Sequence, residues 1–252
     1  MANDNQFFSR SEALLGEKTM QRLANSHVLV VGVGGVGSWC AEALVRTGVG
    51  HLTLMDDDTV AASNVNRQCP ATSSTIGRPK VEALAERLRE INPTADIIPL
   101  AQRYPSHPSL TPPSPSSPSS PPSTLSTLST FSTLILIDAI DSVDCKARLI
   151  LDAFAAGVPV LSSMGAALRM DPTKVRLTRF EKVEGDGLAR ALRQRFRKLG
   201  EFPGKFSCVW SAEQPVQIVP GQPKGSLMPV TATFGMCLAA EALRILRKEN
   251  DE

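Results

Sequence analysis

The sequence lacks the cysteine spacing of a disulfide framework or of a paired-thiolate zinc site. Its five cysteines are scattered and odd in number, and no two of them are separated by just two residues. We therefore expect reduced thiols and no zinc. The first residues also lack the basic-then-apolar pattern of a secretory signal, so we expect a cytoplasmic protein.

Strong net charge and long uncharged apolar segments are also absent. The formal net charge is +2, which is too small to indicate nucleic-acid binding by itself. The longest apolar helical segment, Pro229 to Leu246, contains Glu241 and Arg244, so we expect a buried core helix rather than a membrane span. Hydrophobic residues make up 42% of the chain, which excludes global disorder.

Two common catalytic patterns are missing. There is no G-x-x-x-x-G-K-[ST] segment, which argues against a P-loop ATPase. No Ser–His–acid order stands out, and the three histidines, His27, His51 and His107, are interpreted as structural or loop-borne.

An apolar run that breaks into spaced glycines is the most informative feature of the chain. Val28–Val31 precede four glycines in six residues, at Gly32, Gly34, Gly35 and Gly37. This pattern predicts a buried strand that meets a helix through a turn where the backbone approaches a phosphate. Asp56 follows 19 residues after Gly37. It is placed to accept hydrogen bonds from ribose hydroxyls, although a strand-end turn would use the same residue.

Strands and helices are predicted to alternate along the chain. We expect strands at 28–31, 51–55, 96–100, 134–137 and 158–161, and helices at 36–46, 80–91 and 144–156. Such a series indicates an α/β protein with a doubly wound, mostly parallel, Rossmann-like sheet. A strand at 174–179, a basic helix at 187–199, a strand around 206–210 and a helix at about 230–248 are expected to extend this sheet on the substrate side.

Residues 105–133 differ from the rest of the chain. Of these 29 residues, 24 are Pro, Ser or Thr, and none is charged. Because such a segment cannot offset its ordering entropy by burial, we expect a flexible, neutral insertion. We predict one domain over residues 1–252, with an ordered core at 7–104 and 134–247.

A polar cassette follows the second predicted strand. Ser63-Asn64-x-x-Arg67-Gln68 and then Lys80 supply groups that a nicotinamide enzyme has no evident need for. Either cation alone could be a surface charge, but together they suggest charge stabilisation during displacement at phosphorus. Asp141 is the natural magnesium ligand, and Asp138 is expected only to cap the following helix. We hypothesise a fold that uses ATP to activate a carboxylate.

With these residues the chain resembles the ubiquitin-activating-enzyme-like superfamily of adenylating enzymes, which includes molybdopterin- and thiamine-pathway members. The resemblance implies a homodimer in which each ATP is held by residues of both subunits. By this resemblance, ATP would be held by Gly32, Gly34, Gly35, Gly37 and Asp56, and its phosphates would be bound by Asn64, Arg67 and Lys80. Asp141 would bind magnesium, and Arg10 would reach the ATP of the partner subunit.

Within the superfamily the chain looks most like the tRNA threonylcarbamoyladenosine dehydratases. The matching segments include Asp138-Ala-Ile-Asp-Ser142, Ser163-Met-Gly-Ala166 and Met170-Asp-Pro-Thr173. This resemblance implies adenylation of the threonyl carboxylate on position 37 of a tRNA. Attack by the ureido nitrogen would then close a ring and release AMP.

The basic helix supplies candidates for tRNA contact. Six Lys and Arg residues between Leu188 and Lys205 face only Glu201. The candidates for phosphate contact are Arg190, Arg193, Arg195 and Arg197. An ordinary solvated helix face accounts for the same residues, and both interpretations stay open.

Other functions also stay open. The chain could activate the C-terminal carboxylate of a ubiquitin-like sulfur carrier, or be a non-catalytic adaptor of the same fold. A nicotinamide oxidoreductase is more distant. A sulfur-transfer accessory protein is a further candidate partner, and Cys208 is either a buried thiol or a nucleophile.

Overall fold

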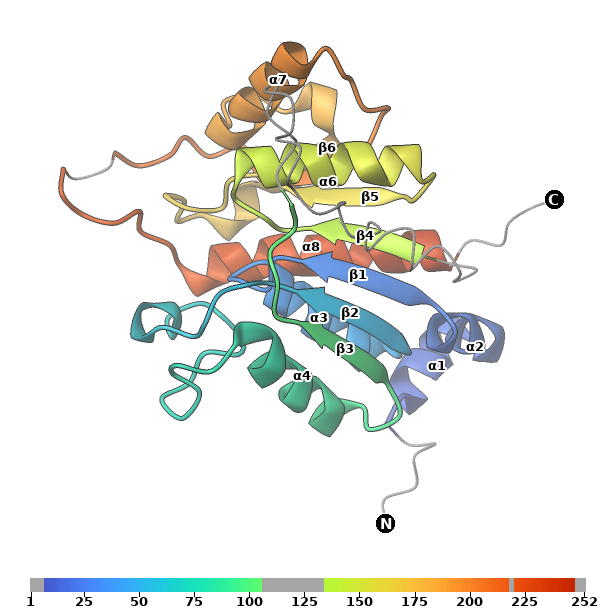
Figure 1. Cartoon of the computed structure of the whole chain (residues 1–252). Coiled ribbons are helices and arrows are strands. Elements are labelled where there is room, and N and C mark those ends of the chain that lie inside the picture. The colour runs from blue at the N-terminus through green and yellow to red at the C-terminus, as the bar shows by residue number, and fades with distance from the viewer. Residues whose placement is uncertain (1–6, 106–133, 218–219, 248–252) are drawn as a thin grey trace, which may run out of the picture.

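The computed structural model describes residues 7–105, 134–217 and 220–247, and within them one sheet runs through the molecule (Figure 1). The strand order is β3-β2-β1-β4-β5-β7-β6, and among the described strands only β6 is antiparallel to its neighbour. The strands are β1 His27–Val31, β2 His51–Met55, β3 Asp96–Leu100, β4 Leu134–Asp138, β5 Val160–Ser163, β6 Val175–Arg179 and β7 Ser207–Ser211. The predicted doubly wound, mostly parallel sheet is confirmed, and its last two strands in the chain, β6 and β7, extend it as expected.

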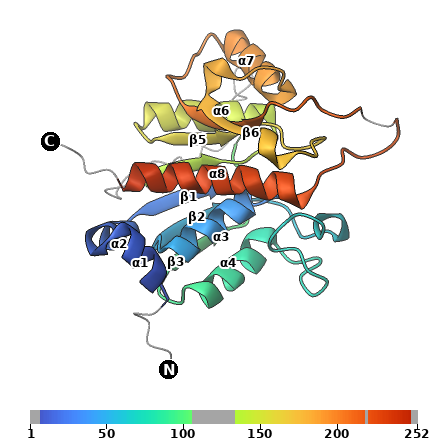
Figure 2. The same ribbon diagram turned by 180° about the vertical axis from the view of Figure 1, so that it is seen from behind.

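Helices cover both faces of this sheet (Figures 1 and 2). They are α1 Ser9–Leu15, α2 Glu17–Ala24, α3 Gly37–Thr47, α4 Lys80–Ile91, α6 Val143–Ala155, α7 Gly187–Leu199 and α8 Met228–Leu246, with single 3₁₀ turns η2 Ala62–Asn64, η3 Pro172–Lys174 and η4 Phe180–Lys182. The bounds of α4 and α7 agree with the predicted ones. The sequence did not predict α1 and α2, because each is under three turns long and between them only Leu23 is buried.

The two faces of the sheet form two separate cores. Val28 and Val30 of β1 join the core under α3, α4 and α8, whereas Leu29 and Val31 join the core under α6 and α7. Because successive strand side chains point to opposite faces, a strand buried on both faces must be apolar throughout. This explains the uninterrupted apolar run before the glycines.

Helix α8 lies across the back of the sheet beside α3 (Figure 2). In the described part of the chain it is the one helix long and apolar enough to cross a membrane. Its Phe234, Leu238 and Ala242 are fully buried in the first core. A Cβ on Gly235 would lie 2.5 Å from the Val36 carbonyl oxygen, so the glycine permits close packing on α3. The predicted core helix is confirmed.

The largest shift in strand position is at β5. The predicted strand 158–161 begins two residues later, because the N–H groups of Gly157 and Val158 still bond to the Phe154 and Ala153 carbonyls at the end of α6. The predicted Ser/Pro/Thr-rich insertion at 105–133 lies outside the described residues, apart from Pro105. The single-domain division therefore stays a prediction.

Candidate active site

A cavity of about 850 Å³ opens at the carboxyl ends of the strands. Its walls include Val31 and Met55, the last residues of β1 and β2, and Ala139, which follows β4. The sheet order reverses between β1 and β4, and doubly wound sheets bind ligands at such a switch point. The volume suits a small-molecule ligand.

The glycine turn forms one wall of this cavity. Gly32 has a φ of +89°, and a Cβ there would lie 2.6 Å from the Ala139 carbonyl oxygen. Gly32, Gly34 and Gly35 line the cavity, but Gly37 is buried and is not among its lining residues. A Cβ on Gly37 would lie 1.9 Å from the Gly32 carbonyl oxygen, so this glycine allows the start of α3 to pack against the turn.

Asp56 lines the cavity and also holds its own loop. One carboxylate oxygen accepts from the Val33 N–H at 2.8 Å, and the other accepts from the Asp58 N–H at 2.9 Å. Burial raises the pKa of this carboxyl above its usual value, while those hydrogen bonds and the Lys80 charge act to lower it. Each oxygen keeps a lone pair, so the turn role and a ribose-binding role are compatible.

The cassette lies directly beside the glycine turn. A Cβ on Gly35 would be 3.3 Å from Arg67 Cγ, and Asn64, Arg67 and Gln68 all line the cavity. Asn64 Oδ1 accepts from the Ala61 N–H at 3.0 Å, and Arg67 Nη1 donates to the Ser63 carbonyl at 2.9 Å. The two motifs, which the family resemblance assigns to one ATP, therefore lie together.

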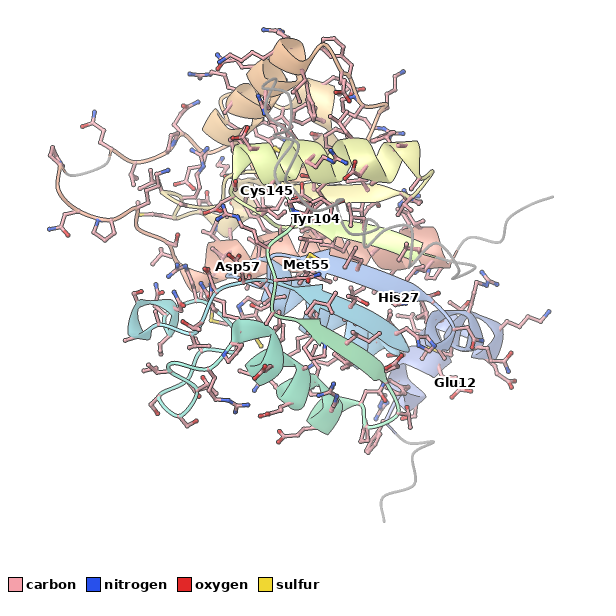
Figure 3. All side chains as sticks on the ribbon, viewed as in Figure 1. Glu12, His27, Met55, Asp57, Tyr104 and Cys145 are labelled. Carbon is pink, nitrogen blue, oxygen red and sulfur yellow. The ribbon has the colours of Figure 1, made fainter. Side chains whose placement is uncertain are left out.

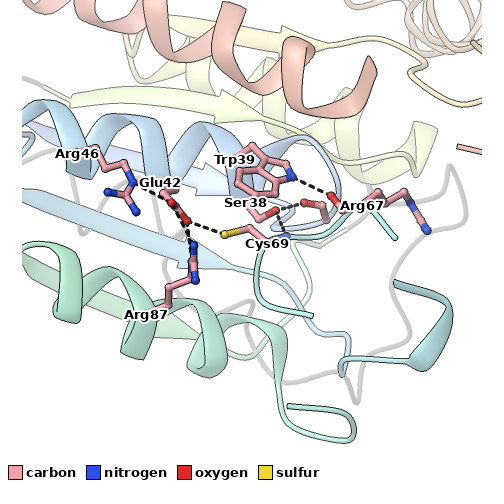
Figure 4. Close-up of polar contacts among 8 residues, drawn as sticks. Ser38, Trp39, Glu42, Arg46, Arg67, Cys69 and Arg87 are labelled. Atoms are coloured by element: carbon pink, nitrogen blue, oxygen red, sulfur yellow. Dashed lines mark hydrogen bonds and ion pairs between the residues drawn. The ribbon is translucent and has the colours of Figure 1, made fainter. Parts of the chain in front are cut away.

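Helix α3 fixes the cassette through its backbone (Figure 4). Trp39 Nε1 donates to the Arg67 carbonyl at 2.8 Å, and Ser38 Oγ accepts from the Cys69 N–H at 3.2 Å. These bonds use backbone groups of Arg67 and Cys69, and the Arg67 guanidinium points away from Trp39 and Ser38 (Figure 4).

Glu42 joins the cassette to α3 and α4 in the same network (Figure 4). It accepts from Cys69 Sγ at 2.8 Å, Arg87 Nε at 2.7 Å and Arg46 Nε at 2.8 Å. Burial alone raises the pKa of Glu42, but hydrogen bonds from Arg87, Cys69 and Arg46 outweigh burial and lower it to about 2. The cassette is thus attached to two packed helices.

Several carboxylates line the same cavity as Lys80, which is a buried cation. Lys80 Nζ lies 2.6 Å from Asp58 Oδ2, and only 6% of the lysine side chain is exposed. Asp56, Asp57 and Asp58 each place an oxygen within 4.8 Å of the others. Asp141 is exposed and lines the cavity from the loop after β4. Carboxylate oxygens of this kind suit Mg²⁺ that also binds phosphate oxygens.

The predicted cap role of Asp138 is wrong. Ser142, not Asp138, is the N-cap residue of α6. Asp138 is fully buried and accepts from Lys146 Nζ at 2.6 Å and from Ser162 Oγ at 2.6 Å. This pairing could not be predicted from the sequence, because a lysine on a helix is almost always a surface charge.

A single chain does not bring Arg10 to the cavity. Arg10 is exposed on α1, which lies beside the amino end of β2 (Figure 1). In Figure 3, Glu12 of the same helix and His27 lie at one end of the sheet, and Asp57 and Cys145 lie at the other. The role of Arg10 across a dimer therefore stays a prediction.

The structure divides the four arginines predicted to contact tRNA. Arg193 Nη2 donates to the carbonyls of Phe180 at 2.8 Å and Val183 at 2.7 Å, and Arg195 Nε lies 2.7 Å from Asp144 Oδ1. Both side chains thus bond to other parts of the protein, because α7 packs beside η4 and α6. Arg190 and Arg197 are exposed and point the same way, since residues seven apart on a helix differ by about 20°.

Several cavity residues were not predicted from the sequence. Five such residues also line the cavity: Arg103, Tyr104, Arg169, Asp186 and Lys224. Their only sequence signal is that some lie next to segments that carried the family resemblance. Cys208 is fully buried, is not among the lining residues, and burial raises the pKa of its thiol to about 12, which supports the buried thiol over the nucleophile.

The histidine interpretation is confirmed where the structure describes it. His27 is fully buried, and its Nε2 lies 2.9 Å from Thr53 Oγ1. Burial, together with the neighbouring His51, lowers the pKa of His27 to about 4. His107 lies outside the described residues.

The fold and the switch-point cavity define a nucleotide-binding protein of the doubly wound α/β class. The ThiF family model matches residues 8–252, and the chain belongs to this family.

Similar proteins place the chain more closely within the family. It is 34% identical over 264 residues to the tRNA threonylcarbamoyladenosine dehydratase of Escherichia coli (strain K12), covering 95% of this chain and 92% of that protein. The Bacillus subtilis (strain 168) protein of the same name is 36% identical, with 84% and 76% covered. The crystal structure of the E. coli dehydratase in complex with ATP has a TM-score of 0.81 at 37% identity, covering 96% and 94%.

Proposed function

We propose that this protein dehydrates N6-threonylcarbamoyladenosine in tRNA, using ATP to activate the threonyl carboxylate as an acyl-adenylate. The observation that carries the proposal is one continuous cavity. It joins the glycine turn and the Arg67–Lys80 cations to the loops after β4 and β5. The similarity to dehydratases over nearly the whole chain supports the same reaction.

The first step transfers AMP to the carboxylate. A carboxylate oxygen attacks the α-phosphorus of ATP, and the bond to pyrophosphate breaks. Arg67, Lys80 and Asn64 stabilise the charge that develops on the phosphate oxygens, and the backbone N–H groups at Gly34 and Gly35 add partial positive charge. Lys80 exchanges its contact with Asp58 for one with phosphate, or keeps both through its three donors.

Asp141 would hold Mg²⁺ together with phosphate oxygens, and the Asp56–Asp58 carboxylates lie in the same cavity. The ion would supply charge neutralisation for the triphosphate when bound. The residues present fit it, because all these side-chain donors are carboxylate oxygens.

The second step closes the ring. The ureido nitrogen attacks the acyl carbon, loses its proton, and AMP departs with one of the original carboxylate oxygens. Both reacting groups belong to the same nucleoside, so the step gains the advantage of an intramolecular nucleophile. The net change is loss of one water from the nucleoside, with ATP converted to AMP and pyrophosphate.

The remaining parts of the proposal concern assembly. The protein acts as a cytoplasmic homodimer, in which Arg10 reaches the cavity of the second subunit. Arg190 and Arg197 contact tRNA phosphates, since both are exposed on α7, whose first turn borders the cavity. A sulfur-transfer accessory protein is a further partner to test.

A direct assay tests this function. Purified protein is incubated with ATP, Mg²⁺ and threonylcarbamoylated tRNA, and the tRNA is digested to nucleosides for mass spectrometry. Loss of the mass of one water is expected, and Arg67→Ala should abolish it, while Arg89→Ala on the far end of α4 serves as the matched arginine control. An unchanged nucleoside, with AMP formed only when a ubiquitin-like carrier protein is added, would instead favour the sulfur-carrier reaction.

A further inference from the structure

Arg169 is a buried cation that lines the cavity. Only 3% of its side chain is exposed, and it lies in the loop between β5 and β6. Within the described ranges, its Nε and Nη1 atoms have no hydrogen-bond partner. Buried donors are rarely left unpaired, and a buried charge is costly unless it is compensated. This guanidinium therefore has unused capacity for an anion inside the cavity.

The nearest carboxylate does not use that capacity. Asp186 Oδ2 lies 3.9 Å from Arg169 Nη2, which is too long for a hydrogen bond. The Asp186 carboxylate instead accepts from the Ala189 N–H at 2.8 Å, as the N-cap of α7, and from the Gly165 N–H at 3.2 Å. Asp186 thus balances part of the charge of Arg169 and leaves its donors available.

The backbone around Arg169 is held in place from both sides. Leu168 has a φ of +63° and is the only described non-glycine residue with a positive φ. Its N–H donates to the Gly225 carbonyl, and its carbonyl accepts from the Val216 N–H, both at 2.9 Å. On the other side, the Glu213 carboxylate accepts from the Met170 N–H at 3.0 Å and the Asp171 N–H at 2.9 Å. Strain that the surroundings maintain in this way is typical of functional sites.

We propose that Arg169 binds the carboxylate of the acceptor nucleoside, the same carboxylate that ATP activates. The inference rests on the proposed function and adds a residue that recognises the acceptor. The cavity would then hold the triphosphate with Arg67 and Lys80 and the acceptor carboxylate with Arg169, since all three residues line it. A guanidinium suits this role, because it stays charged and its planar donors match a carboxylate.

Binding without ATP separates this proposal from the proposed reaction. The probes are a tRNA anticodon stem-loop that carries N6-threonylcarbamoyladenosine and the same stem-loop with plain adenosine, which lacks the carboxylate. We expect the parent protein to prefer the modified stem-loop. Arg169→Met should lower affinity for it by about 10- to 100-fold, the loss typical of one or two charge-assisted hydrogen bonds, and leave the unmodified stem-loop unaffected.

The other outcomes overturn the proposal in distinct ways. Equal loss for both stem-loops would mean that Arg169 binds an RNA phosphate. Unchanged preference for the modified stem-loop, with lower thermal stability, would mean that it only balances Asp186. Arg176→Met, at an exposed position outside the cavity, is the matched control and should change neither affinity.

Two further variants guard against misfolding. Arg169→Lys keeps the charge, so it should retain part of the preference for the modified stem-loop. Its affinity for ATP should equal that of the parent protein. Asp186→Asn keeps an acceptor for the N-cap and removes the charge, so it should preserve the preference. If Asp186→Asn removed the preference as fully as Arg169→Met, the ion pair itself would be the functional unit and the proposal would be wrong. Dehydration by the parent protein is scored separately, so failure of the reaction is distinguishable from failure of this inference.

Discussion

Lys146 and Asp138 form an ion pair with no solvent exposure, and this pair should be a major determinant of stability. Both side chains are 0% exposed, and the charged atoms are 2.6 Å apart. Lys146→Met preserves the unbranched chain but leaves the Asp138 carboxylate buried with only Ser162 Oγ and the Ile140 N–H as donors. Breaking a buried pair in this way costs about 3–5 kcal/mol, which in a protein of this size corresponds to a fall in Tm of about 6–20 °C.

Urea and thermal unfolding of matched variants measure this effect. Lys18→Met, at an exposed position on α2, is the control and should stay within about 0.5 kcal/mol of the parent. The double variant Lys146→Met/Asp138→Asn removes both charges and should recover most of the loss. If Lys146→Met instead stayed within about 1 kcal/mol of the parent, the buried carboxylate would have other compensation and the ion pair would not determine stability.

Three further predictions concern other charged groups. Glu42 has a pKa of about 2 in the folded protein, against 4.5 for the free side chain, because hydrogen bonds outweigh the effect of its burial. The ionised Glu42 therefore contributes about 3 kcal/mol to the free energy of unfolding above pH 4.5, and this contribution is lost as the pH falls towards 2. In urea unfolding experiments between these pH values, Glu42→Gln should lose stability less steeply than the parent protein. Arg193→Ala should destabilise the fold by about 1.5–3 kcal/mol, because it leaves two carbonyls unpaired. Arg197→Ala should weaken tRNA binding and leave Tm unchanged. The reverse pattern would contradict the assignment of Arg193 to the fold and of Arg197 to tRNA. Mixed dimers of Arg10→Ala and Arg67→Ala subunits should recover activity, and no recovery would rule out a shared site.

Much of the fold could be predicted because its signals are local. The apolar β1 run, the stripe of Lys80–Ile91 and the turn residues around them define each element without reference to the rest of the chain. The boundary of β5 could not be predicted, because the end of α6 is set by backbone hydrogen bonds to Gly157 and Val158 that carry no side-chain signal. Short helices such as α1 have too few turns to show a period.

In the site, too, only the features with local sequence signals could be predicted. The glycine turn and the cassette are each compact in sequence, so the family resemblance could assign both to one ATP, and both line the cavity. The pairing of Lys146 with Asp138, the internal use of Arg193 and the unpaired donors of Arg169 depend on which elements pack together. A helical lysine or arginine looks the same in sequence whether it faces solvent or a buried carboxylate.

Oxygen tracing would show whether the cavity transfers AMP to a carboxylate. The threonyl carboxylate of the modified tRNA is labelled with heavy oxygen, and the nucleotide products of one round of reaction are analysed by mass spectrometry. We expect one labelled oxygen in the phosphate of AMP, because the acyl carbon releases that oxygen with AMP when the ring closes. Unlabelled AMP, or formation of ADP and phosphate, would show that the carboxylate is not adenylated.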